Sequence, residues 1–150
     1  MANVESFRVV LERILPAPPP DVFRAWTDPE SLRVFMCPGS LTSAEVEADV
    51  RVGGRFRIVM GKVEHTGEYR VVDSPSRLVF TWHSPSTGPG GSLVTIALAP
   101  DAGGTRLVLT HEQLPSDDVA ARHRQGWGSI LEKLERRLLS TRGAGRRENA

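Results

Sequence analysis

The chain has 150 residues, of which 39% are hydrophobic and 25% are charged, and its formal net charge is +1. This length and composition fit one globular domain with its own hydrophobic core, and they exclude a disordered or fibrous chain. A net charge so close to zero also excludes the concentrated basic surface on which nucleic-acid binding depends, so we expect no nucleic-acid partner.

The first part of the chain predicts one strand followed by two short helices. Residues 6–15 are rich in β-branched and apolar side chains and stop at the proline cluster that begins with Pro16. Because proline cannot continue a sheet ladder, this segment predicts a strand able to lie at a sheet edge. Apolar residues at one-turn spacing then predict a helix over Val22, Phe23 and Trp26. Asp28 and Pro29 supply the N-cap and first turn of a second short helix.

From about residue 44 the pattern changes to six short strand-like segments separated by turn sequences. They cover residues 44–50, 55–60, 63–72, 77–83, 92–99 and 105–113. Consecutive strands joined by turns pair in the antiparallel sense, so six in a row without an intervening helix predict a meander.

The last predicted element is a long amphipathic helix. Ser116 is a good N-cap, the two aspartates that follow complement the positive end of a helix, and the pattern continues to about Ser140. The apolar stripe comprises His123, Trp127, Ile130, Leu131, Leu134 and Leu138. Residues 1–140 are therefore expected to form one domain, and residues 141–150 a frayed, disordered tail.

A long sheet can bury this helix only by curving around it. The sequence therefore predicts an α+β domain with the order β-α-α-β-β-β-β-β-β-α and an apolar cavity between the sheet and the C-terminal helix.

Five segments in this order resemble one known bacterial family. They are VFRAWTDPESL (22–32), ADVRVGGRFRIVM (48–60), GEYRVVDSPSRLVFTW (67–82), GGTRLVLTHEQLP (103–115) and GWGSILEKLERRL (126–138). The chain resembles, from about Phe7 to Leu138, the family named after the C-terminal domain of the heat-shock protein 90 ATPase activator, in the START-related, Bet-v-1-like superfamily. The resemblance implies the helix-grip fold. It leaves function open, because that superfamily includes lipid carriers, polyketide cyclases, hormone receptors, resistance proteins and a co-chaperone domain. Where many relatives carry one or two tryptophans, this chain reads LRVFMCPG over residues 32–39.

Alternation along the predicted strands selects the candidate ligand-binding residues. One face of each strand is expected to line the cavity; His65, Tyr69 and Val71, for example, are predicted to share a face. The candidates are Trp26, Phe35, Met36, Phe56, Ile58, Met60, His65, Tyr69, Phe80, Trp82, His111, Trp127 and Leu131. For the phenylalanine, isoleucine and leucine members, plain burial in the core is the competing interpretation.

Two further features bear on the cavity. Gly126 and Gly128 lie inside the predicted helix, where each costs up to about 1 kcal/mol relative to alanine. They indicate either close packing against the sheet or room left for a ligand. As the cyclase relatives suggest, Tyr69 and His111 could form an acid/base pair acting on an enolisable substrate. The histidines show no metal-binding spacing, and we expect neither a metal nor another cofactor.

The sequence thus favours binding of a small hydrophobic or aromatic ligand, lipid-like or polyketide-like. Two alternatives stay open: a co-chaperone that activates a heat-shock protein 90 ATPase homologue, and a cyclase, aromatase or hydrolase enzyme using the same cavity. A homodimer is a further possible partner. The single cysteine, Cys37, favours a reducing compartment. Since no stretch approaches a signal peptide or a membrane span, we expect a cytoplasmic protein.

Overall fold

The computed structural model describes the backbone of residues 7–148 and the side chains of residues 7–141. Its elements follow the predicted order. They are β1 (Phe7–Leu15), α1 (Pro19–Thr27), α2 (Pro29–Phe35), β2 (Glu45–Ala48), β3 (Arg55–Met60), β4 (Val63–Asp73), β5 (Arg77–Trp82), β6 (Ser92–Asp101), β7 (Gly104–Leu114) and α3 (Asp117–Glu148).

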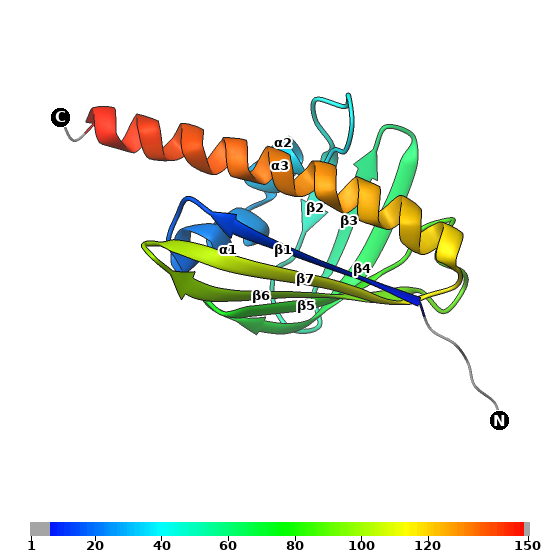
Figure 1. The fold of residues 1–150 in the computed structure, drawn as a ribbon. Helices are drawn as coiled ribbons and strands as arrows, with labels where there is room; N and C mark the ends of the chain where they lie inside the picture. The colour runs from blue at the N-terminus through cyan, green and yellow to red at the C-terminus, as the bar shows by residue number, and fades with distance from the viewer. Residues whose placement is uncertain (1–6, 149–150) are drawn as a thin grey trace.

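The strands form one antiparallel sheet in the order β1-β7-β6-β5-β4-β3-β2. β1 lies at an edge, as predicted, and pairs with β7, so that Leu11 lies opposite Leu109. The sheet curves, and α3 lies along its concave side, while α1 and α2 close one end (Figure 1). This is the α+β helix-grip fold that the sequence predicted.

Local sequence explains where the helices begin. The Asp28 side chain accepts a hydrogen bond from the Glu30 backbone N–H at 3.1 Å and so caps α2. Ser116 Oγ accepts from the Val119 N–H at 3.2 Å and satisfies one of the free donors of α3. Both predicted caps are confirmed.

The core lies between α3 and the concave face of the sheet. Along β3, the alternate residues Phe56, Ile58 and Met60 are buried, as strand periodicity predicts. The apolar stripe of α3 meets them, and Trp127, Ile130, Leu131, Leu134 and Leu138 are all buried. None of the helices in the described part of the chain is long and apolar enough to cross a membrane.

Two expectations are wrong. Val71 does not share the face of Tyr69, because an irregularity in the β4–β5 pairing falls between these residues and puts Val72 opposite Leu78. An extra residue of this kind shifts the alternation by one position, and Val72 packs against the core instead. The helix α3 also continues past Ser140 to Glu148. Residues 141–148 are therefore helical, and the remainder of the predicted tail, 149–150, lies outside the described residues.

Candidate functional site

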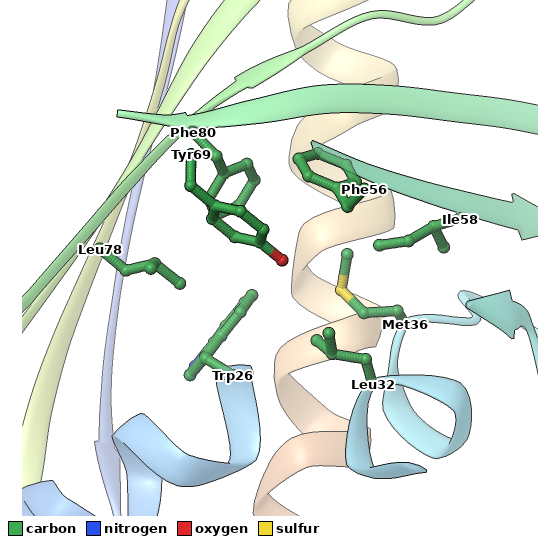
Figure 2. A pocket seen from close by; sticks show the side chains of 8 residues that line it. All are labelled: Trp26, Leu32, Met36, Phe56, Ile58, Tyr69, Leu78 and Phe80. Atoms are coloured by element: carbon green, nitrogen blue, oxygen red, sulfur yellow. The ribbon is translucent and has the colours of Figure 1, made fainter. Parts of the chain in front are cut away.

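A small pocket lined by buried side chains lies where α1 and α2 meet the sheet. Its walls are Trp26, Leu32, Met36, Phe56, Ile58, Tyr69, Leu78 and Phe80 (Figure 2). Its volume is about 10 Å³, which is the space that one water molecule needs. The protein's own side chains therefore fill most of the interior.

Tyr69 contributes a hydroxyl group to this interior pocket. Its side chain is 3% exposed, and its hydroxyl points into the middle of the pocket (Figure 2). Burial, with a smaller contribution from the Asp49 charge, raises the pKa of this hydroxyl above its usual range. The hydroxyl is consequently a neutral hydrogen-bond donor, and the structure shows no partner for it among the described residues.

A larger cavity, which we call the outer cleft, opens beside α3. Its volume is about 260 Å³. It lies between α3, the loop after α2 and the ends of β3, β4 and β5. Its walls include Pro38, Leu41, Met60, His65, Trp82, His123, Gly126, Trp127 and Ile130.

Aromatic rings form the boundary between the two cavities. Trp82 and Trp127 line the outer cleft and lie with their ring centroids 5.1 Å apart. Trp82 also contacts Phe56, a wall of the interior pocket, at a centroid distance of 6.0 Å. On the outer side, the His65 ring lies 4.8 Å from that of Trp82. Such rings present a large apolar surface with a few polar edges, as ligand sites do.

A hydrogen bond from Trp127 to the buried His111 fixes the orientation of the Trp127 ring. Trp127 Nε1–H donates to His111 Nδ1 at 2.9 Å, so that nitrogen has no hydrogen of its own. His111 Nε2–H therefore donates to Ser92 Oγ at 2.7 Å, and the Ser92 hydroxyl donates to the Trp82 carbonyl at 2.8 Å. Burial, and then the nearby His123 and His65, lower the pKa of His111 to about 3. His111 is thus a neutral ring with both nitrogens engaged, and it orients one tryptophan of the cleft.

The loop that covers the cleft is tied to α3 by polar contacts. Lys133 Nζ donates to the carbonyl oxygens of Cys37 and Leu41. The Gly39 N–H donates to Ser129 Oγ at 2.7 Å. These contacts hold Leu41 against the outer cleft, and they arise from residues on the side of α3 next to its apolar stripe.

The structure divides the predicted site residues into three groups. The interior pocket receives Trp26, Met36, Phe56, Ile58, Tyr69 and Phe80. The outer cleft receives Met60, His65, Trp82 and Trp127. Phe35, His111 and Leu131 are buried but line neither cavity.

Several wall residues were missed among the candidates. Leu32 lies on α2 and Leu41 on the loop, where no strand alternation marks a face. Two others could have been found from the sequence: His123 belongs to the predicted apolar stripe, and Gly126 is a glycine inside a predicted helix. Among the described residues, no group of three or more His, Cys, Asp or Glu side chains is arranged to hold a metal ion.

Comparison with known proteins places this architecture in a family. The model of the family described as "Activator of Hsp90 ATPase homolog 1-like protein" matches residues 16–138. The chain belongs to this family. The match includes all the residues that line the two cavities, and β1 lies outside it. No match was found among curated protein sequences.

Solved structures support the assignment to the Hsp90-activator-like family. An uncharacterised protein from Rhizobium leguminosarum is 31% identical, with a TM-score of 0.73 over 91% of this chain and 96% of that one. A protein from Mesorhizobium loti is 27% identical, with a TM-score of 0.76 over 90% and 98%. A protein of Plasmodium falciparum described as an HSP90 activator is also 27% identical, with a TM-score of 0.71 over 89% and 95%.

Proposed function

We propose that the protein binds a small hydrophobic or aromatic ligand between the sheet and α3, in the outer cleft. The cleft's volume of about 260 Å³ lies just below the range of small-molecule pockets, which starts at about 300 Å³. Its walls are mostly apolar, with tryptophan rings at its base and a few polar groups at its sides. This combination is typical of ligand sites, where apolar surface supplies affinity and polar groups fix orientation.

The main support for the proposal is the open space beside Gly126. A methyl group built on this glycine would meet nothing within 4 Å, so close packing does not require a glycine here. Glycine inside a helix nevertheless costs up to about 1 kcal/mol relative to alanine. Because Gly126 lines the outer cleft, what the glycine preserves is open space on the helix surface facing that cleft.

Filling this space gives a first prediction. Gly126→Ala should raise the free energy of unfolding by up to about 1 kcal/mol, since alanine favours the helix and meets no neighbour. Gly126→Leu should instead weaken binding of an aromatic probe, β-naphthol, at least about tenfold by occupying the cleft. Chemical denaturation and quenching of tryptophan fluorescence measure the two effects.

Gly128 provides the matched control. It lies in the same helix, and an added methyl group would come no closer than 3.9 Å to the end of the Arg13 side chain. Gly128→Ala and Gly128→Leu should therefore change helix stability as the corresponding Gly126 variants do, but their side chains should not enter the outer cleft. Equal β-naphthol affinity in the two leucine variants would overturn the proposed site.

A second candidate function is activation of a heat-shock protein 90 ATPase homologue. It is supported by the family and by the 27% identity to the Plasmodium falciparum protein described as an HSP90 activator. On this hypothesis, added protein should raise the steady-state ATP hydrolysis rate of such a chaperone. Gly126→Leu should stimulate the chaperone as the unmodified protein does if activation uses another surface. An unchanged hydrolysis rate at saturating protein would contradict the hypothesis.

A further inference from the structure

The polar groups of the outer cleft have defined hydrogen-bonding states. His123 Nδ1 lies 2.8 Å from the Val119 carbonyl oxygen, and His65 Nδ1 lies 3.3 Å from that of Ile58. A carbonyl oxygen can only accept, so each Nδ1 carries the hydrogen. Burial is the main cause that lowers the pKa of both imidazoles below the usual value. At neutral pH each ring is therefore uncharged, with an acceptor lone pair on Nε2.

The hydrogen bonds of both rings to Ile58 and Val119 use Nδ1, and the His65 ring has a further backbone contact with Val63. Both histidines line the outer cleft. Trp82 adds an unused donor. Its side chain is 2% exposed, it lines the same cleft, and its indole N–H is buried without a partner. An unpaired buried donor destabilises the fold, so the Trp82 N–H favours a ligand that accepts a hydrogen bond from it.

The charge in the cleft is confined to its rim. Among the residues that line the cleft, Arg122 carries a positive charge, and it is exposed to solvent. Water and salt weaken the attraction that such a charge exerts on an anionic ligand. His65, His123 and Trp82 are uncharged and together offer two acceptors and one donor.

From these contacts we propose that the ligand is a neutral aromatic or other apolar molecule that carries a hydroxyl group. A hydroxyl both donates and accepts, so it can donate to a histidine Nε2 and accept from the Trp82 N–H. A carboxylate has no hydrogen to donate, and an ammonium group has no lone pair to offer. This inference rests on the proposed function, and it assigns His123 and His65 as specificity-determining residues.

The test compares three probes of one shape: β-naphthol, β-methylnaphthalene and β-naphthoate. A net hydrogen bond contributes about 1–1.5 kcal/mol, which corresponds to roughly tenfold in affinity. We therefore expect β-naphthol to bind roughly tenfold tighter than β-methylnaphthalene, and β-naphthoate to bind more weakly than β-naphthol. Fluorescence quenching on the full chain gives all three dissociation constants.

Variants connect the preference to named atoms. His123→Leu should remove most of the hydroxyl preference while leaving β-methylnaphthalene affinity within about twofold. His123→Gln, whose side-chain oxygen can accept, should restore part of the preference. Trp82→Phe, which removes the indole N–H, should also reduce it. Denaturation curves verify that each variant is folded, and the glutamine variant retains a polar helix residue if the leucine variant does not fold.

The outcomes separate the two proposals. If no probe binds, the proposed ligand-binding function fails. If β-naphthol and β-methylnaphthalene bind equally, ligand binding stands and the hydroxyl inference is overturned. Tighter binding of β-naphthoate, lost in Arg122→Gln, would also overturn it, because an acid would then be recognised at the rim. An unchanged preference in both His123 variants would overturn the assignment of His123.

Discussion

The protein is expected to lose stability steeply as the pH falls below about 6.5, because of His111. In the folded state burial lowers the pKa of this imidazole to about 3, from an ordinary value of 6.5. Between these two values the unfolded chain binds a proton that the folded chain does not, so acid favours unfolding. The free energy of unfolding should fall by up to about 1.4 kcal/mol per pH unit from this group alone. Denaturant unfolding measured from pH 7 down to pH 4 gives the slope.

His111→Gln isolates this contribution. Glutamine can accept from Trp127 and donate to Ser92, but it does not titrate in this range. The lowered pKa values of His65 and His123 act in the same direction and remain in the variant. The variant should therefore show a shallower slope than the unmodified protein, whatever its stability at pH 7. Identical slopes would show that His111 is not the buried neutral group described above.

Gly67→Ala is expected to be the most damaging of the small substitutions. A methyl group there would lie 2.0 Å from the Thr81 carbonyl oxygen and 2.4 Å from the Phe56 ring. The Phe56 ring, which lines the interior pocket, lies over this glycine, and the Thr81 carbonyl is part of the adjoining backbone. Overpacking typically costs about 1–3 kcal/mol and more where backbone must move. We expect a loss of at least about 2 kcal/mol in denaturant unfolding.

Gly90→Ala is the comparison for Gly67→Ala. A methyl group on Gly90 would meet nothing within 4 Å, and substitutions at such surface positions usually change stability by less than about 0.5 kcal/mol. Should the two alanine variants unfold at the same denaturant concentration, the close approach of Phe56 to Gly67 would be contradicted.

The order of the elements could be predicted because each carries a local signal. The alternation of Phe56, Ile58 and Met60 marks a strand with one buried face, and the Asp28 and Ser116 caps mark helix starts. For Val71, prediction from strand alternation gives the wrong face of the sheet. One irregular pairing shifts the alternation, and no residue type near Tyr69 announces it.

The location of the site was predictable only in part. Alternation identified which side chains face α3, but cavity volume depends on how those side chains interlock, to within fractions of an ångström. Hence the interior around Tyr69 is nearly filled, while the open volume lies beside Trp127. The loop residue Leu41 reaches the cleft through contacts with Lys133, which is 92 positions away in sequence. No local pattern encodes that contact.

His111 illustrates the same limit for chemistry. Its strand position correctly predicted burial. Its role depends on Ser92 and Trp127, which are 19 and 16 residues away and engage both ring nitrogens. A sequence shows that a histidine is available, whereas its tautomer and pKa follow from the partners that the fold supplies.

The pairing of the first strand with the last has a consequence for how the protein is made. Phe7 lies opposite Leu114, so β1 leaves the ribosome long before the strand that it pairs with. Until β7 is synthesised, β1 has no native neighbour in the sheet, since the order of strands places it beside β7 alone. Contacts so distant in sequence form slowly, because the entropy of closing the long intervening loop is lost before the contacts stabilise the fold. During synthesis the nascent chain therefore exposes the apolar side chains of β1. This is the stage at which aggregation or chaperone capture would compete with folding.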